Sequence, residues 1–205
     1  MPGVSSAEDI LRFWFCPEPK TPEEALARMG HWYGGGSDLD DEIHRRFGAL
    51  VERARRGELD DWARTPRGSL ALIILIDQFS RNLYRGRAAA FSHDGKALQL
   101  ARDGYDAAAF EGFGTLEHVF AAMPFCHAES LEDQRRGLHL ATRNALRAPP
   151  HLLSAAQLNV DWGRKHLDVV ARFGRFPHRN ETLGRSSTPE EQEYLAYCKA
   201  TGQWL

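Results

Sequence analysis

The sequence lacks both the cysteine pairs of a disulfide framework and the long apolar runs of a membrane protein. Its three cysteines, Cys16, Cys126 and Cys198, are widely separated, odd in number and never in a CxxC spacing. The longest apolar run, Leu70 to Ile76, is far too short to cross a bilayer. Met1 to Asp9 has no basic segment followed by an apolar core, so we predict no signal peptide. These absences predict a cytoplasmic location in a reducing compartment, with no membrane partner.

A strong charge of either sign is also absent. The 26 Lys and Arg residues and the 28 Asp and Glu residues leave a formal net charge of -2. General nucleic-acid binders are usually basic, so we predict no nucleic-acid partner. The chain has 205 residues, of which 42% are hydrophobic, and this is enough apolar material for one core. We therefore predict a single domain over residues 1–205.

Motifs that announce a cofactor or a metal are missing as well. No GK[ST] triplet follows Gly34-Gly35-Gly36, and no HExxH zinc signature occurs. The candidate metal ligands, His127 with Glu129 and His166 with His178, lack the spacing of a histidine pair on one helix turn. We predict no cofactor and no obligatory metal, and we interpret the three glycines as a flexible connection.

Helix start and stop signals recur along the whole chain. Ser6 with Asp9 and Thr188-Pro189-Glu190-Glu191 place a capping residue before an acidic first turn. Gly57 and Gly174 follow periodic apolar segments and are typical of helix ends. Because no run shows the two-residue alternation of a half-buried strand, we predict an all-α fold of about nine helices.

Two predicted boundaries bear on the site. A helix that starts at Thr21 is expected to end near Met29. The apolar helix that starts at Leu116 is expected to stop at Pro124, because proline removes a helical hydrogen bond. His127 and Glu129 would then lie in a loop just before the next helix, near its positive end.

The buried run Leu70 to Ile76 continues into polar residues. Asp77, Arg81 and Arg85 follow it at four-residue spacing, so on a helix they share one face, where Asp77 and Arg81 can pair. Gln78 and Asn82 form the neighbouring row. Such a pair either stabilises the core or carries polar groups into a cleft, and both interpretations remain open.

A second polar concentration lies near the C-terminus. The stretch RFGRFPHRN, residues 172–180, alternates aromatic rings with cationic and polar groups. From Arg172 to Arg185 there are four arginines and one histidine against the single acid Glu181. Guanidinium groups present fixed forks of donors that suit carboxylates and phosphates, so this stretch is a candidate anion site.

Six stretches stand out along the chain: FWF (13–15), DQFSRNLYRG (77–86), PFCHAES (124–130), RFGRFPHRN (172–180), LGR (183–185) and TPEE (188–191). They resemble the bacterial family called domain of unknown function 924, and the resemblance covers nearly the whole chain in order. It implies an all-helical fold of tetratricopeptide-like helix hairpins and no established activity. Where the family tends to have Glu and Ser around the loop histidine, this chain has Cys126 and Ala128.

Together these features predict a polar Arg/His cleft that binds a small anionic molecule. Arginine forks would hold the anionic group, and a histidine would serve as general acid or base near neutral pH, which suits hydrolysis of a phosphorylated or carboxylated compound. The predicted catalytic residues are His127 and His178. The predicted ligand-binding residues are Asp77, Arg81, Asn82, Arg85, Glu129, His166, Arg172, Arg175, Arg179 and Asn180.

Two other interpretations use the same residues. Tetratricopeptide-like hairpins often form a groove for a peptide, and the arginines would then hold a peptide carboxylate without catalysis. Alternatively, the arginines tie helices together through buried ion pairs that do no chemistry. In that case Arg172, Arg175 and Arg179 would pair with Asp77, Glu129, Glu132 or Asp133.

Overall fold

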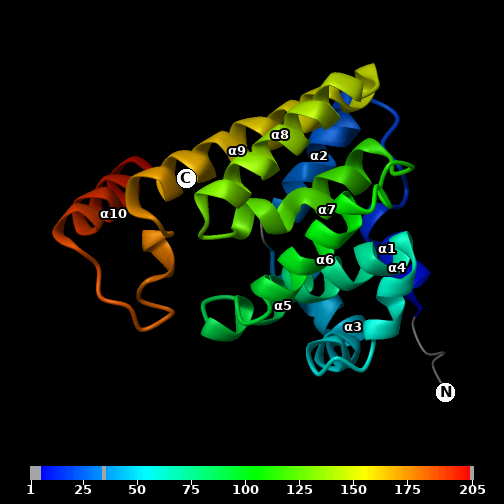
Figure 1. Ribbon diagram of the computed structural model, residues 1–205, viewed down its shortest axis with the longest axis horizontal. Coiled ribbons are helices and arrows are strands. Elements are labelled where there is room, and N and C mark those ends of the chain that lie inside the picture. The colour runs from blue at the N-terminus through cyan, green and yellow to red at the C-terminus, as the bar shows by residue number, and fades with distance from the viewer. Residues whose placement is uncertain (1–5, 34–35, 204–205) are drawn as a thin grey trace.

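The computed structural model describes residues 6–33 and 36–203, apart from the side chain of Ser37, so most of the expected glycine connection and the first five residues lie outside the described part. Helices dominate this part and no strand occurs within it, which confirms the all-α prediction (Figure 1). The α-helices are α1 (Ala7–Phe15), α2 (Pro22–Tyr33), α3 (Ser37–Arg55), α4 (Pro66–Ile73), α5 (Ser80–Leu83), α6 (Asp94–Asp106), α7 (Thr115–His127), α8 (Leu131–Arg147), α9 (Leu153–Phe173) and α10 (Pro189–Thr201). Short 3-10 turns are η1 (Asp60–Arg64), η3 (Ala88–Ala90), η4 (Pro150–Leu152) and η5 (Pro177–Arg179), and η2 (Ile74–Phe79) is a π turn.

The helix ends follow the capping chemistry of the sequence. Ser6 and Asp9 exchange side-chain-to-backbone hydrogen bonds at the start of α1, and Thr188 and Glu191 do the same at the start of α10. Gly174 ends α9 with a φ of 69°, a left-handed conformation that costs a glycine little. Because α4, the π turn and α5 form one continuous helix, the ten α-helical segments of the described chain make nine separate helices.

The main core lies where α1, α2, α4 and α7 meet. Trp14 of α1 stacks on Trp32 of α2 with ring centroids 5.7 Å apart, and Trp32 meets Phe120 of α7 edge-on at 4.7 Å. The apolar run Leu70–Ile76 is completely buried behind these rings. Burial of this many large side chains is the principal favourable term in folding.

Two helices extend further than the sequence predicts. Helix α2 ends at Tyr33 rather than near Met29, because Trp32 packs in the core. Helix α7 continues through Pro124 and ends at His127. An interior proline costs a helix about 3 kcal/mol, but every residue from Val119 to Cys126 is buried, and this burial outweighs the cost.

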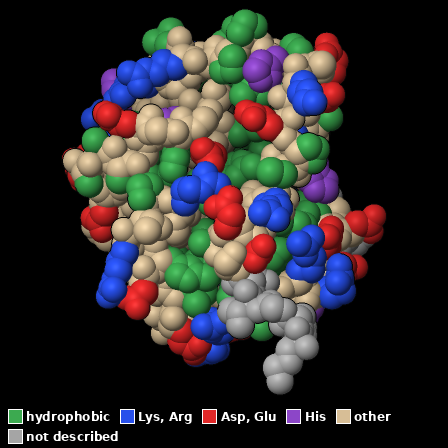
Figure 2. Space-filling view, turned by 90° about the vertical axis from the view of Figure 1, so that its right-hand side faces the viewer, with side chains coloured by type: hydrophobic (Ala, Val, Ile, Leu, Met, Phe, Trp, Pro, Cys, Tyr) green, Lys and Arg blue, Asp and Glu red, His purple; other side chains and the backbone are tan. Residues whose placement is uncertain are grey.

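The arrangement of helices brings distant segments to one place. Helices α7, α8 and α9 lie side by side as successive hairpins, while α10 and the segment that precedes it lie beyond the C-terminal end of α9 (Figure 1). Residues at the end of α7, the start of α6, the π turn and η5 therefore meet. No helix of the described chain is long and apolar enough to span a membrane. On the face shown in Figure 2, acidic and basic side chains are interspersed.

Candidate functional site

The π turn carries Asp77 into the interior of the protein. Its side chain is completely buried, and its Oδ1 accepts hydrogen bonds from Arg81 Nη1 and His127 Nδ1, both at 2.8 Å. Gln78 donates to the other oxygen. Burial alone would raise the pKa of Asp77, but Arg81 and His127 outweigh burial and hold the pKa below its usual value. The carboxylate is therefore ionised at neutral pH, and the predicted pairing of Asp77 with Arg81 is confirmed.

This carboxylate fixes the protonation pattern of His127, the last residue of α7. An ionised carboxylate can only accept hydrogen bonds, so Nδ1 of His127 must be protonated and must donate the hydrogen bond to Asp77. Burial, followed by the positive charge of Arg81, lowers the pKa of His127, so the ring is neutral at pH 7. Its Nε2 then holds a lone pair, and no described residue donates a hydrogen bond to it.

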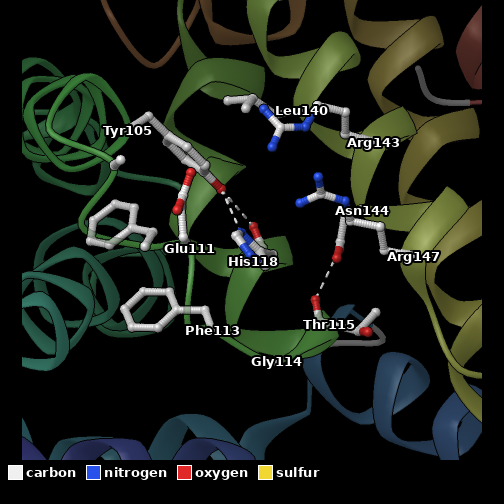
Figure 3. Close-up of a pocket in the computed structure, with 12 residues that line it drawn as sticks. Tyr105, Glu111, Phe113, Gly114, Thr115, His118, Leu140, Arg143, Asn144 and Arg147 are labelled. Atoms are coloured by element: carbon white, nitrogen blue, oxygen red, sulfur yellow. Dashed lines mark hydrogen bonds between the residues drawn. The ribbon is translucent and has the colours of Figure 1, made fainter.

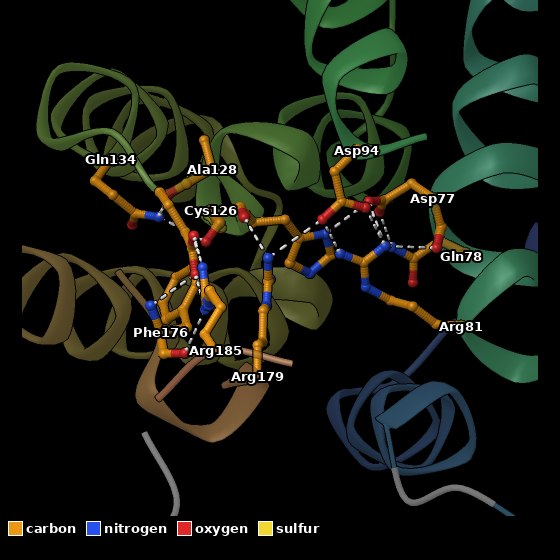
Figure 4. A network of polar contacts seen from close by, with 12 residues as sticks. Asp77, Gln78, Arg81, Asp94, Cys126, Ala128, Gln134, Phe176, Arg179 and Arg185 are labelled. Atoms are coloured by element: carbon orange, nitrogen blue, oxygen red, sulfur yellow. Dashed lines mark hydrogen bonds and ion pairs between the residues drawn. The ribbon is translucent and has the colours of Figure 1, made fainter. Parts of the chain in front are cut away.

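Asp94, the first residue of α6, joins Asp77 to the C-terminal stretch. Arg81 donates two hydrogen bonds to the Asp94 carboxylate, at 3.0 Å from Nη1 and at 2.9 Å from Nη2. Arg179 of η5 reaches the same carboxylate at 3.3 Å. Figure 4 shows Arg81, Asp94 and Arg179 in one continuous network, so residues 77 and 179 are brought together through an acid that neither stretch contains.

Arg179 is buried and incompletely bonded. Only 6% of the residue is exposed, and its guanidinium lies between the rings of Phe91 and Phe176, 4.7 and 4.5 Å from their centroids. Its Nη1 also donates to the carbonyl of His127 at 3.1 Å, but its Nε has no partner among the described residues. Burial and then the nearby Arg81 lower its pKa to about 10, so the cation gains from any further acceptor.

A hollow of about 700 Å³ opens beside these groups. It lies between the start of α6, the loop after α7 and the segment after η5. A space of this size is within the range of small-molecule sites. Among its lining residues are Phe91, Asp94, Arg102, His127, Arg179 and Leu183.

A second hollow, of about 280 Å³, meets His127 from the side of α9. The His166 ring lies 6.5 Å from the His127 ring, and its Nδ1 donates to the Trp162 carbonyl at 2.8 Å. Burial lowers the pKa of His166 to about 4, so its Nε2 also holds a lone pair. Asn159 is only 5% exposed and its amide has no hydrogen-bond partner in the described chain. Tyr33, Met123, Cys126 and Gly163 complete the lining.

The arginines between residues 172 and 185 are already paired with acids. Arg175 makes two bonds to Glu191, at 2.7 and 2.8 Å. Arg185 makes two bonds to Glu129, at 2.6 and 2.9 Å, and donates to Asn180 at 3.0 Å. Asn180 in turn donates to Glu191 at 3.2 Å. These contacts tie η5 and the following segment to α10 and to the loop after α7.

Asn82 and Arg85 belong to a different place. Asn82 donates to Asp40 of α3 at 2.7 Å, and Arg85 makes two bonds to the same carboxylate, both at 3.1 Å. Helix α5 ends at Leu83, so the helical row that starts with Asp77 and Arg81 does not continue to Arg85. These two predicted ligand-binding residues therefore fasten α3 to the end of α5 and do not line the hollows beside His127.

Arg172 and His178 also lie apart from the network around Asp77. Arg172 is exposed and pairs with Glu190 at 2.8 Å. His178 is exposed on η5, where its ring lies 5.6 Å from that of Phe176, and it makes no hydrogen bond with any described residue. Of the two predicted catalytic histidines, only His127 is held by a carboxylate.

Sequence reasoning missed the acids that complete these networks and the amide of α9. Asp94 looked like an ordinary acidic residue at a helix start, and Glu191 like part of a capping box. Asn159 shares a helix face with Trp162 and His166, and a polar residue on that otherwise apolar face was the available signal. The partner of each acid comes from a segment remote in sequence, which spacing cannot reveal.

Metal binding has a limited basis. Within the described ranges, no three His, Cys, Asp or Glu residues are grouped so as to hold a metal ion. His127 and His166 each donate Nδ1–H to an oxygen and keep Nε2 free, which is the usual orientation of histidine ligands. Cys126 lies beside them, but burial raises the pKa of its thiol to about 12, so it is not a thiolate at neutral pH.

Comparison with known proteins is consistent with this architecture. A solved structure of a protein of unknown function from Agrobacterium tumefaciens is similar to the chain, with 34% sequence identity and a TM-score of 0.76 over 92% of this chain and 96% of that one. No curated protein matches. The family model described as "Bacterial protein of unknown function (DUF924)" matches residues 10–198. The chain therefore belongs to the DUF924 family.

Proposed function

We propose that this protein binds a small anionic molecule in the hollow beside Arg179 and that His127 acts there as a general base. The single observation that carries the proposal is the contact of Asp77 with His127, which leaves Nε2 of a neutral, largely buried histidine free. A histidine held in this way is suited to accept a proton from a bound molecule. The arrangement favours an enzyme over a purely structural ion-pair network.

Arg179 supports the anionic character of the ligand. Its lowered pKa and its unpartnered Nε indicate that the buried cation is incompletely stabilised by the protein. A phosphate or carboxylate in the hollow would stabilise this guanidinium through its charge and a charge-assisted hydrogen bond. Arg175 and Arg185 contribute less, because carboxylates already occupy their guanidinium forks.

Hydrolysis is the reaction that these groups suit best. His127 Nε2 would take a proton from water while the water oxygen attacks the phosphorus or carbonyl carbon of the ligand. The bond to the leaving oxygen then breaks, and that oxygen takes the proton back from His127. Arg179 would stabilise the negative charge that develops. No side-chain nucleophile is needed, which agrees with the raised pKa of Cys126.

A binding screen and a turnover assay test this function together. Sugar phosphates, nucleotides and carboxylates are screened by thermal shift. Release of p-nitrophenol from p-nitrophenyl phosphate and from p-nitrophenyl acetate reports hydrolysis. A ligand at a hundred times its Kd adds about 2.7 kcal/mol, which raises the Tm of a domain of this size by about 5–11 °C. We expect Arg179→Lys to weaken binding and Arg164→Lys, an exposed arginine of α9, to leave it unchanged.

The role of His127 is tested by separating binding from turnover. His127→Gln should retain binding and lose turnover by about 10²–10⁴-fold, since this is the usual contribution of a general base. His139→Gln, at an exposed position of α8, is the matched control. Hydrolysis that survives His127→Gln refutes general-base catalysis. A peptide carboxylate bound equally by both variants would indicate the non-catalytic peptide-binding alternative.

A further inference from the structure

A third hollow, of about 330 Å³, lies away from His127 and shares no lining residue with the other two. It is enclosed by the segment after α6, the first turns of α7 and the side of α8 (Figure 3). Ala108, in its wall, has a φ of 54°, a left-handed conformation that is strained for a residue other than glycine. Backbone strain of this kind is more frequent at binding sites than elsewhere.

Two arginines give this hollow its charge. Arg143 and Arg147 are one turn apart on α8, and their guanidinium groups point into the hollow (Figure 3). Neither forms an ion pair or hydrogen bond with another described residue, in contrast to Arg175 and Arg185. Glu111 lines the same space but pairs with neither arginine. Like charges four residues apart on a helix repel each other, so an anion between the two arginines would remove this repulsion.

The opposite wall is aromatic. Tyr105 stacks on His118 at an angle of 26°, with ring centroids 6.1 Å apart, and Phe113 meets His118 edge-on at the same distance. Burial, and then Arg143 and Arg147, lower the pKa of His118, so the cationic groups of this hollow at neutral pH are its arginines. A planar ring could pack against this wall while an attached anion reaches α8.

Asn144 supplies a polar group between the two walls. It is only 9% exposed, and its Nδ2 donates to the Thr115 carbonyl at 2.9 Å, which fixes the orientation of the amide. Its Oδ1 accepts no hydrogen bond from the described part of the chain. A buried, oriented acceptor of this kind fits an N–H or O–H group of a ligand.

We propose that this hollow is a second binding site, for a small aromatic or heterocyclic molecule that carries a phosphate or carboxylate group. Arg143 and Arg147 hold the anionic group, Tyr105 and Phe113 contact the ring, and Asn144 accepts a hydrogen bond from it. The site is independent of the function proposed for His127.

Calorimetric titration of the full chain tests the proposal. The probes are adenosine monophosphate, phenyl phosphate and benzoate, with adenosine and inorganic phosphate as the ring and the anion alone. We expect at least one ring-bearing anion to bind, and adenosine and inorganic phosphate to bind at least about tenfold more weakly. Arg143→Gln and Arg147→Gln should each weaken binding by roughly tenfold or more, because a charge-assisted bond is lost. Arg135 is exposed on the same helix and pairs with no residue of the described chain, so Arg135→Gln should leave binding unchanged.

Three results would overturn the proposal. One is the absence of binding by every ring-bearing anion at millimolar concentration. Another is inorganic phosphate binding as tightly as phenyl phosphate, since the aromatic wall would then contribute nothing. The third is unchanged affinity in the double variant of Arg143 and Arg147. Both arginines are exposed, so these variants should fold, and circular dichroism melts confirm it before titration.

Discussion

Replacement of Asp77 by asparagine should destabilise the protein strongly, because it removes the charge at the centre of the buried network. Asp77→Asn keeps the shape of the side chain but leaves Arg81 and His127 without the carboxylate that both contact at 2.8 Å. Arg81 keeps its two bonds to Asp94, so its charge is not left entirely unpaired.

The size of the effect follows from these contacts. Removal of one partner from a buried ion pair costs about 3–5 kcal/mol, and the remaining contact with Asp94 places our expectation near the lower limit, at about 3 kcal/mol. For a domain of this size, about 3 kcal/mol corresponds to a Tm lowered by roughly 6–12 °C. Urea unfolding at pH 7 gives the free energy, and a thermal melt gives the Tm.

An exposed carboxylate provides the control. Asp61 pairs with Arg64, but the two side chains are 82% and 79% exposed, so Asp61→Asn should change the free energy of unfolding by less than about 0.5 kcal/mol. A loss of less than about 1 kcal/mol in Asp77→Asn would refute the inference that the network depends on a buried charge.

Three further predictions concern packing and pH. Gly104→Ala should lower the free energy of unfolding in urea by about 1–3 kcal/mol, because its Cβ would lie 2.0 Å from the Phe110 ring. Gly95→Ala, in open space on the same helix, should not destabilise the protein. Equal effects of the two substitutions would contradict this packing. His166 is neutral in the fold with a pKa of about 4, so wild-type stability should fall as pH drops from about 6.5 toward 4. In denaturation at pH 7 and pH 5, His166→Gln should lose less stability between the two pH values than the wild type does. An equal loss in both proteins would refute the lowered pKa of His166. The pKa of Glu191 is lowered to about 2 by its partner Arg175, so Glu191→Gln should be less stable than the wild type at pH 7. In thermal melts at acid pH, this difference in stability should shrink below about pH 4.5. A difference that stays constant would contradict the lowered pKa.

Local chemistry explains why the helices were predictable. The caps at Ser6 and Thr188 and the glycine at 174 each act within one turn of helix, so their positions in the sequence suffice. The pairing of Asp77 with Arg81 is equally local, being one turn long. The predicted helix end at Pro124 was wrong because burial of its neighbours, a tertiary effect, outweighs the lost hydrogen bond.

The candidate site was predictable only in part, because its contacts join segments far apart in the chain. His127 could be chosen as a histidine near polar stretches, but its contact with Asp77 spans fifty residues. Arg179 reaches Asp94 across eighty-five. The sequence also could not show that Arg175 and Arg185 would be neutralised by acids of other segments, which leaves fewer free cations than the four arginines between residues 172 and 185 suggest.

The orientation of His127 is the claim on which the proposed function depends most directly. A nitrogen-15 spectrum of the histidine side chains, assigned with His127→Gln, reports which ring nitrogen carries the proton. We predict a neutral ring at pH 7 with the proton on Nδ1, and a changed Nδ1 signal in Asp77→Asn. A proton on Nε2, or a charged imidazolium at pH 7, would contradict the account, because His127 would then have no lone pair on Nε2 to accept a proton from water.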